Sequence, residues 1–359
     1  MLKLLTIVGA RPQFIKAAAI SHTIKDLYSD QIQEDILHTG QHYDDAMSAR
    51  FFRELDIPAP RYNLGVGSGS HGAQTAAMLR GVEEVLLSEH YDAVLVYGDT
   101  NSTLAGALAA AKVNVPVMHV EAGLRSYNRA MPEELNRVLT DHASTLLFAP
   151  TEAARENLCR EGFAHDKVFL SGDVMLDNVR RYASSAILPD CYEGEQILLT
   201  LHRNLNTDDD KRLKAILSGV DMAAGRLGAK AMFAVHPRVA KAVESMMFDN
   251  IKPVPPLSYH ETLAVLQKVR LVMTDSGGLQ KESFFSGRPC VVLRTETEWT
   301  EIVDCGAAIL AGGEERSIVA AAERMWSVKP VPPSQFGDGR AAEQIVASIL
   351  HHYRNESMH

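Results

Sequence analysis

Residues 94–137, VLVYGDTNSTLAGALAAAKVNVPVMHVEAGLRSYNRAMPEELNR, contain two apolar segments that are each followed closely by an acidic residue. The first segment, 93–97, is as short and apolar as a strand buried in a parallel sheet, and Asp99 follows it just before an Ala-rich helix. The second segment, 115–120, has the same character and leads into Glu121. Because ligands bind at the carboxyl ends of strands in an open α/β sheet, we expect both acids to face one crevice.

A third acid follows shortly afterwards. Pro132 is typical of the first position of a helix, and Glu133 comes directly after it. A single carboxylate near a helix start is most often a cap, which is the alternative interpretation of Asp99 and Glu133. Three carboxylates in one crevice repel one another, which separates acid from base roles. We therefore interpret Asp99, Glu121 and Glu133 as catalytic residues.

Strand and helix patterns alternate along the whole chain, which predicts βαβ units and a mostly parallel sheet. With 359 residues, the chain is long enough for two α/β domains with a cleft between them. The polar, proline-bearing stretch PDCYEG at 189–194 places the boundary between about 172 and 194. The expected strands are 3–8, 35–38, 93–97, 115–120, 146–149, 168–170, 196–201, 230–235, 251–254, 271–274, 290–293 and 307–310, and the expected helices include 13–27, 46–55, 72–89, 104–112 and 341–353.

The composition is typical of a globular protein without a membrane segment. Hydrophobic residues make up 46% and charged residues 23%, and no apolar run approaches the roughly 18 residues of a membrane span. The apolar segment 2–10 is too short for a signal peptide and leads directly into Arg11, so we expect a cytoplasmic protein. Four cysteines without paired or metal-ligand spacing indicate reduced thiols and neither a disulfide nor a zinc site. A net charge of −9 gives no support for binding nucleic acid or an anionic membrane.

Arg11 and Lys16 form the first of two candidate anion sites. They lie at the start of the helix that follows the first strand, where free backbone N–H groups and the helix dipole favour anions. The segment has neither GxGxxG nor a P-loop, so a dinucleotide fingerprint and a kinase-type phosphate cradle are not supported. Two surface cations on a helix are the alternative interpretation.

Ser276-Gly277-Gly278 forms the second candidate anion site. A strand ends there, glycines let the backbone approach a ligand, and a helix begins, so amides and a hydroxyl can converge on a phosphate. Glu282, one turn into that helix, is suited to accept hydrogen bonds from sugar hydroxyls. A plain glycine turn is the alternative, but one such element in each half favours a ligand with a diphosphate and a second polar part.

Two histidines come directly after successive strands of the second half, each close to an arginine: His202-Arg203 and His236-Pro237-Arg238. A lone histidine is more often a structural hydrogen-bonding residue than a catalyst. The repeated pair favours a role near pH 7, as a general acid or base or as a donor to a leaving phosphate.

Six motifs extend in order from residue 9 onward: GARPQFIK at 9–16, GDT at 98–100, HVEAGLR at 119–125, PEELNR at 132–137, LHR at 201–203 and TDSGGLQKE at 274–282. Together they resemble the non-hydrolysing UDP-N-acetylglucosamine 2-epimerase family. The resemblance implies two Rossmann-like parallel-sheet domains in a GT-B arrangement with an interdomain cleft, and usually a homodimer. Its domains correspond here to 1–180 with the catalytic carboxylates, 181–335 with the UDP site, and a C-terminal helix at 336–359 that packs back on the first domain.

The family's reaction inverts C2 of a UDP-sugar. UDP is eliminated to leave a 2-acetamidoglucal and is re-added after a proton returns to the other face. By motif, Asp99, Glu121 and Glu133 resemble the family's catalytic acids and His202 its essential histidine, and no metal or redox cofactor is implied. The residues that resemble its UDP-sugar contacts are Arg11, Lys16, Arg137, His236, Ser276, Gly277, Gly278 and Glu282.

Two positions depart from the family pattern and bear on the sugar. Leu205 stands where the family often has an acid after His-Arg, and Trp299 stands where its best-known members have arginine. Trp299, with Met131 and SGDVM at 171–175, is more similar to the branch acting on UDP-2,3-diacetamido-2,3-dideoxyglucuronate or on amino-fucose precursors of surface polysaccharides. We therefore predict a UDP-sugar 2-epimerase of polysaccharide biosynthesis, with UDP-N-acetylglucosamine or a 2,3-diacetamido analogue as substrate.

Three other functions are compatible with these motifs. A GT-B glycosyltransferase would share the fold and the UDP site but would need an acceptor groove, which the sequence does not show. A hydrolysing epimerase would release UDP and the free sugar. A non-catalytic UDP-sugar sensor would have no use for three acids and His202 together.

Segment 41–44, QHYD, resembles the part of the family's main branch that binds a second UDP-sugar as an activator. Asp44 stands where that branch commonly has an uncharged polar residue. Its charge would repel a diphosphate roughly 4–6 Å away by a few kcal/mol. The sequence therefore predicts hyperbolic kinetics without an obligatory activator.

Overall fold

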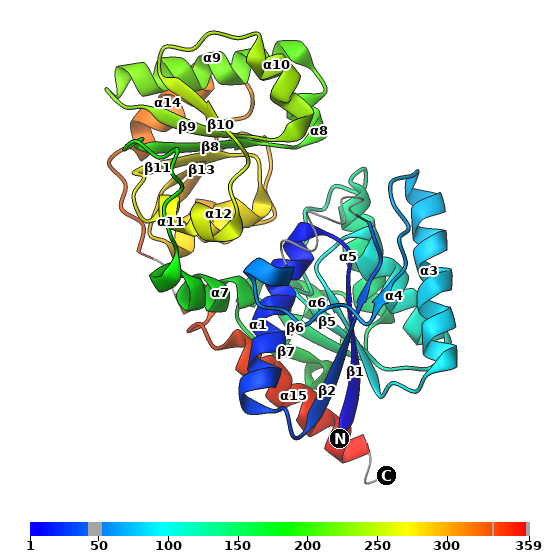
Figure 1. The fold of residues 1–359 in the computed structure, drawn as a ribbon. Coiled ribbons are helices and arrows are strands. Elements are labelled where there is room, and N and C mark those ends of the chain that lie inside the picture. The colour runs from blue at the N-terminus through cyan, green and yellow to red at the C-terminus, as the bar shows by residue number, and fades with distance from the viewer. Residues whose placement is uncertain (42–51, 332–333, 357–359) are drawn as a thin grey trace. The chain divides into compact units, whose positions relative to one another are not determined.

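The structure, a computed structural model, describes residues 1–41, 52–331 and 334–356. The chain divides into two α/β units (Figure 1). Unit 1 comprises Met1–Asn178 and Ser334–His359, unit 2 comprises Val179–Pro333, and the boundary falls within helix α7 (Val174–Tyr182). Each unit has one sheet whose paired strands are all parallel, so the predicted class of two parallel-sheet α/β domains is confirmed. None of the helices in the described part of the chain is long and apolar enough to cross a membrane.

Unit 1 contains a seven-stranded sheet in the order β3-β2-β1-β4-β5-β6-β7. Helix α15 packs beside α1, and α3 packs beside α4 (Figure 1). The helix expected over 46–55 lies mostly outside the described residues. The strands are β1 (Leu2–Val8), β2 (Ile32–His38), β3 (Tyr62–Asn63), β4 (Ala93–Tyr97), β5 (Val117–Val120), β6 (Leu146–Ala149) and β7 (Val168–Leu170). The other helices are α1 (Arg11–Leu27), α3 (His71–Ser88), α4 (Asn101–Lys112), α5 (Pro132–Ala143), α6 (Glu152–Arg160) and α15 (Ala341–Glu356).

The central strands of unit 1 are buried along their whole length. Every residue of β4, β5 and β6 is buried, as expected for parallel strands covered by helices on both faces. Helix α4 presents small side chains to this sheet, and a Cβ added to Gly106 would lie 2.8 Å from Cδ1 of Ile7. The Ala-rich pattern of α4 therefore lets the helix pack closely against the sheet.

Unit 2 contains a six-stranded sheet in the order β10-β9-β8-β11-β12-β13. Pro253 lies in the edge strand β10, where its missing N–H costs no ladder hydrogen bond. The strands are β8 (Ile197–Leu201), β9 (Ala231–Val235), β10 (Ile251–Val254), β11 (Leu271–Thr274), β12 (Cys290–Val292) and β13 (Ala308–Leu310). The helices are α8 (Asn204–Thr207), α9 (Asp210–Arg226), α10 (Ala240–Glu244), α11 (Tyr259–Leu266), α12 (Gly277–Phe285), α13 (Thr300–Asp304) and α14 (Glu315–Met325).

Both sheets reverse their strand order once, and these reversals locate the candidate site. In unit 1 the chain moves from β1 outward to β2 and β3, and then returns to the other side of β1 with β4. In unit 2 the corresponding reversal lies between β8 and β11. Ligands of open α/β sheets bind outside the carboxyl ends of strands at such switch points. The turns after β1, β4, β8 and β11 are therefore the ones that matter for function.

Candidate active site

The turn after β1 is bound to the turn after β4 through one buried side chain. Oε1 of Gln13 accepts hydrogen bonds from the backbone N–H groups of Gly9 (2.8 Å) and Ala10 (3.1 Å). Nε2 of Gln13 donates to the carbonyl oxygen of Tyr97 at 3.1 Å. The start of α1, which carries the first candidate anion site, is thereby fixed beside the turn that carries Asp99.

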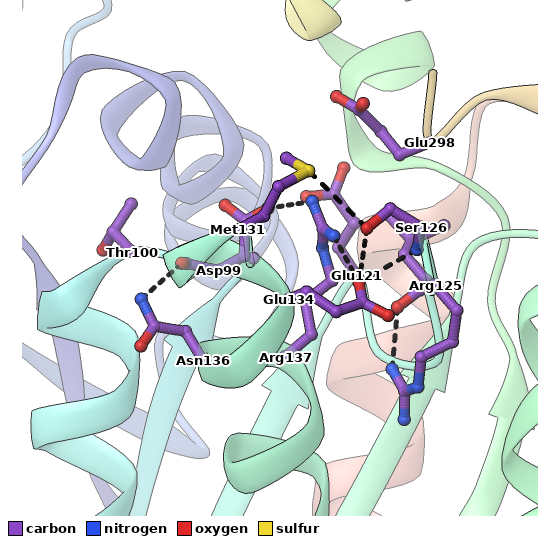
Figure 2. Close-up of polar contacts among 12 residues, drawn as sticks. Asp99, Thr100, Glu121, Arg125, Ser126, Met131, Glu134, Asn136, Arg137 and Glu298 are labelled. Atoms are coloured by element: carbon purple, nitrogen blue, oxygen red, sulfur yellow. Dashed lines mark hydrogen bonds and ion pairs between the residues drawn. The ribbon is translucent and has the colours of Figure 1, made fainter. Parts of the chain in front are cut away.

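Asp99 is paired with Arg137 of α5. A guanidinium nitrogen of Arg137 lies 2.6 Å from Oδ2 of Asp99, and a second lies 2.7 Å from Oε2 of Glu134 (Figure 2). Nδ2 of Asn136 donates to the backbone carbonyl of Asp99 at 2.9 Å. The Arg137 side chain is buried, whereas 31% of the Asp99 side chain is exposed. Asp99 therefore has a fixed orientation and still has surface that a ligand can reach.

Glu134 supports this arrangement. It is buried and accepts hydrogen bonds from the backbone N–H groups of Ser126 and Tyr127, both at 2.9 Å. Burial by itself would raise the pKa of Glu134, but these N–H groups and Arg137 hold the pKa below its ordinary value. Glu134 is thus an ionised anchor for Arg137. Its neighbour Glu133 is half-buried.

Glu121 has an unusual backbone conformation at the end of β5. Its φ of 71° lies in the left-handed region, which non-glycine residues adopt rarely. Its backbone N–H donates to the carbonyl of Phe148 at 3.1 Å, and its buried carboxylate forms an ion pair with Lys16 of α1. Strain of this kind concentrates at functional sites, where the surrounding structure maintains it. The repulsion among acids expected from the sequence is offset here, because Glu121 and Asp99 each have a cation of their own.

The remaining predicted residues of unit 1 lie on the same edge of the sheet. Arg11 is the first residue of α1 and is half-buried. Gln41, which begins the segment 41–44, accepts hydrogen bonds from the backbone N–H of Ser102 at 3.1 Å and from its hydroxyl at 2.6 Å. The other three residues of this segment, including Asp44, lie outside the described residues.

In unit 2, His202 follows β8 and is held by Asp275, which follows the adjacent strand β11. Nδ1 of His202 lies 2.8 Å from Oδ1 of Asp275. The same carboxylate accepts from the backbone N–H groups of His202 (3.1 Å) and Arg203 (3.0 Å). Burial alone would raise the pKa of Asp275, but His202 and these donors keep the pKa below its ordinary value. An ionised Asp275 thus orients a His202 ring whose side chain is 41% exposed, as in catalytic pairs where a carboxylate sets the ring orientation.

The second candidate anion site lies beside His202. Ser276 is the N-cap of α12, and its hydroxyl oxygen accepts from the backbone N–H of Leu279 at 3.3 Å. Gly277 and Gly278 are the first two residues of the helix. A Cβ on Gly277 would lie 2.2 Å from a carboxylate oxygen of Glu298, so a larger residue here would displace that side chain. Among the other predicted contacts, Glu282 is buried in the same helix, and the His236 ring centroid lies 6.5 Å from that of His202.

The two departures from the family pattern have different environments. Leu205 is exposed in the short helix α8, so its side chain contributes little to packing. Trp299 is buried, and Nζ of the buried Lys281 lies 4.1 Å from its ring centroid in a cation–π contact. Trp299 is therefore part of the packing behind α12. The described residues contain no group of three or more His, Cys, Asp or Glu side chains arranged to hold a metal ion.

Comparison with known proteins agrees with the resemblance seen in the motifs. A family model described as UDP-N-acetylglucosamine 2-epimerase matches residues 25–350. The chain belongs to this epimerase family. Two relatives of this epimerase have similar identities and different names. A UDP-2,3-diacetamido-2,3-dideoxy-D-glucuronate 2-epimerase of Pseudomonas aeruginosa is 45% identical over 350 residues, covering 96% of this chain and 98% of the relative. A UDP-N-acetylglucosamine 2-epimerase of Methanocaldococcus jannaschii is 43% identical over 370 residues, covering 98% and 99%.

A solved structure also matches this epimerase along its whole length. The crystal structure of the Methanocaldococcus jannaschii UDP-GlcNAc 2-epimerase in complex with UDP-GlcNAc and UDP superposes with a TM-score of 0.87. The two chains are 40% identical, and the match covers 98% of this chain and 100% of the other.

Sequence motifs alone did not identify four residues that support the site: Gln13, Glu134, Asp141 and Asp275. Glu134 could have been separated from Glu133 by helical spacing, because Glu134, Arg137 and Asp141 repeat at i, i+3 and i+7 and are all buried. Asp275 directly follows a buried strand, which is the same signal that identified Asp99. No comparable pattern identifies Gln13, since its partners come from three separate segments.

Proposed function

We propose that this protein inverts C2 of a UDP-2-acetamido sugar by eliminating UDP and adding it back across a 2-acetamidoglucal. The observation that carries the proposal is the arrangement of Asp99 and Glu121. They follow the neighbouring parallel strands β4 and β5, of which β4 borders the switch point, and each carboxylate is paired with a buried cation. The left-handed backbone of Glu121 indicates that the turn after β5 is functionally constrained.

Elimination of UDP and removal of the C2 proton explain why the site needs carboxylates and a histidine. The C2 proton of an intact sugar is weakly acidic, and stretching of the C1–O bond places positive charge on C1 and makes removal of that proton feasible. Carboxylates near the ring can take the proton and stabilise the charge. We assign these roles to Asp99, Glu121 and Glu133. His202, oriented by Asp275, would donate to or stabilise the leaving UDP.

The cationic and glycine-rich elements are assigned to UDP. Arg11 lies at the N-terminus of α1 and Ser276 at that of α12, where backbone N–H groups and the helix dipole favour a diphosphate. Lys16 has three ammonium donors, so it can hold Glu121 and a phosphate oxygen together. Glu282 would accept hydrogen bonds from hydroxyl groups of the ligand. The other proposed contacts with the UDP-sugar are Arg137, His236, Gly277 and Gly278.

The similar relatives do not identify which sugar the substrate carries, because they are named for two different UDP-sugars. They are named for UDP-N-acetylglucosamine and for UDP-2,3-diacetamido-2,3-dideoxy-D-glucuronate, at 43% and 45% identity. Both sugars have a 2-acetamido group and a C2 proton, which are the features that the proposed chemistry uses. We propose that the protein serves surface polysaccharide biosynthesis in the cytoplasm as a homodimer, without a cofactor. Light scattering after size-exclusion chromatography tests the dimer.

Incubation with each UDP-sugar in D2O tests the function. NMR and mass spectrometry should show deuterium at C2 and a mixture of two C2 epimers with UDP still attached. Release of UDP with free sugar would instead indicate a hydrolysing epimerase, and transfer of the sugar to an added acceptor would indicate a glycosyltransferase. Unchanged substrate with measurable binding would support a sensor. The double variant Asp99→Asn/Glu121→Gln serves as a control for solvent exchange that does not depend on the enzyme.

A further inference from the structure

His119 is a titratable side chain in the middle of β5 that has no exposed surface. Both of its ring nitrogens face oxygen atoms. Nδ1 lies 2.7 Å from Oδ1 of Asp141, and Nε2 lies 2.8 Å from the backbone carbonyl oxygen of Gly98. A neutral imidazole has one N–H donor and one nitrogen acceptor, and a carbonyl oxygen can only accept. A neutral ring could therefore satisfy both contacts only if Asp141 donated a proton.

Asp141 does not donate, because its surroundings keep it ionised. Its other oxygen, Oδ2, lies 2.7 Å from the guanidinium of Arg125 and accepts from the backbone N–H of Gly123 at 3.2 Å. Burial alone would raise the pKa of Asp141, but His119 and Arg125 hold the pKa below its ordinary value. Both ring nitrogens of His119 must then carry protons.

The surrounding charges allow a buried imidazolium. Arg125 also binds Glu161 through two nitrogens, each 2.7 Å from a carboxylate oxygen. His119 and Arg125 supply two positive charges, and Asp141 and Glu161 supply two negative charges, so the cluster is neutral as a whole. Buried charges persist in proteins when they are paired and hydrogen-bonded in this way. The next charged pair, beyond Gly98, is Lys16 with Glu121.

This cluster is connected to both turns that carry the proposed catalytic acids. Gly98, whose φ of 64° requires a residue tolerant of the left-handed region, immediately precedes Asp99. Its backbone N–H donates to the carbonyl of Val120 at 3.0 Å, while its own carbonyl accepts from His119. On the other side, Asp141 holds the N–H of Gly123, two residues after Glu121.

We propose that His119 is a doubly protonated positioning residue that fixes the Asp99 turn against the Glu121 turn, an inference that rests on the proposed epimerase function. Its imidazolium binds Gly98 on one side and Asp141 on the other. It does not touch the substrate. It acts by keeping the two carboxylates at the separation that proton transfer at C2 needs.

The protonation state is tested on the wild-type protein by NMR of ring ¹⁵N-labelled histidine at pH 8, where an ordinary histidine with a pKa near 6.5 is neutral. We expect one histidine to keep both ring nitrogens protonated and to exchange these protons slowly with D2O, and we expect its signal to be absent from His119→Gln. The inference is overturned if no slowly exchanging histidine is doubly protonated at pH 8. This measurement needs no turnover, and its assignment to His119 uses a His119→Gln variant whose folded fraction is verified by circular dichroism.

The positioning role is tested by the kinetics of His119→Gln, because glutamine has both of its N–H donors on one nitrogen, whereas the imidazolium has one donor on each of two separate nitrogens. Misplacement of reacting groups by about 1 Å can cost on the order of 10²-fold in rate. We expect kcat to fall by about 10- to 10²-fold with KM within about 3-fold, in protein whose folded fraction is verified by circular dichroism. Exposed His90, which pairs with the half-buried Asp92, offers a matched control, and His90→Gln should keep wild-type kcat. A folded His119→Gln with wild-type kcat would overturn the positioning role.

These outcomes are distinct from failure of the proposed function. If wild-type protein introduced no deuterium at C2 of any UDP-sugar, the epimerase proposal would fail. The NMR result would still report the protonation of His119.

Discussion

Substitution of Asp275 by Asn should weaken unit 2 by an amount that follows from its hydrogen bonds. The carboxylate accepts from four donor groups: the backbone N–H of His202 (3.1 Å), that of Arg203 (3.0 Å), Nδ2 of Asn206 (3.1 Å) and Nδ1 of His202 (2.8 Å). Asn retains one acceptor oxygen, which serves about two donors, and adds an NH2 group that faces the others. Two donors without acceptors around this buried carboxylate, at about 1–3 kcal/mol each, lower the free energy of unfolding by about 2–6 kcal/mol.

Calorimetry and turnover measure the two consequences. For a domain of this size, about 2–4 °C of Tm accompanies each kcal/mol, so the unit 2 transition should move down by about 4–24 °C. Turnover of the folded variant should fall by at least about 10²-fold, because His202 loses the partner that orients its ring. The exposed residue Asp210 provides the control, since Asp210→Asn in the first turn of α9 should change stability by less than about 1 kcal/mol.

The pH dependence gives an independent check on Asp275. Its folded-state pKa lies below the unfolded value of about 3.9, so its carboxylate contributes stability above that pH. This contribution is lost as the pH falls through the folded-state pKa. The difference in unfolding free energy between wild type and Asp275→Asn should therefore shrink as the pH is lowered below about 4. A variant with wild-type Tm and turnover, or a difference in unfolding free energy that is constant from pH 7 to acid, would show that an ionised Asp275 does not hold this turn.

Three further predictions concern the assigned roles. Asp99→Asn, Glu121→Gln and His202→Ala should each bind UDP but lose about 10²–10⁴-fold in turnover, and near-normal turnover in all three would remove the catalytic assignment. Arg11→Ala and Ser276→Ala should weaken UDP binding in titration calorimetry by about 10- to 150-fold, the equivalent of a lost charged hydrogen bond at roughly 1.5–3 kcal/mol, and unchanged affinity would exclude them from the site. Initial rates should depend hyperbolically on UDP-sugar concentration, because the carboxylate of Asp44 would repel the diphosphate of a second, activating UDP-sugar. A sigmoidal rate curve would contradict this prediction.

Strand positions were predictable because parallel strands are short, continuous apolar runs with polar residues after them. The runs at β4 and β6 were predicted with the bounds that the structure shows, and β5 begins two residues later than expected, at Val117. The two-residue strand β3 (Tyr62–Asn63) was missed, because so short a segment has no hydrophobic period to detect. The start of α5 was predictable because Pro132 lies there, and proline is favoured at the first position of a helix.

The turns that carry the site residues were predictable from the sequence, whereas most contacts between those residues were not. Sequence position after a strand was enough to select Asp99, Glu121 and His202. It could not show that Arg137 binds Asp99, because that ion pair joins residues 38 positions apart. The left-handed φ of Glu121 likewise depends on tertiary packing and has no local sequence signal.

Positional isotope exchange is the most direct test of the central claim that the C1–O bond breaks and re-forms during epimerisation. UDP-N-acetylglucosamine, or the 2,3-diacetamido analogue if that is the better substrate, would carry ¹⁸O in the oxygen that joins C1 to the β-phosphorus. Phosphorus NMR would then follow the isotope while the enzyme interconverts the C2 epimers. Elimination and re-addition of UDP predicts that ¹⁸O moves into the non-bridging positions of the β-phosphate at a rate comparable with epimerisation. Epimerisation at C2 with ¹⁸O retained entirely in the bridging position would contradict the account.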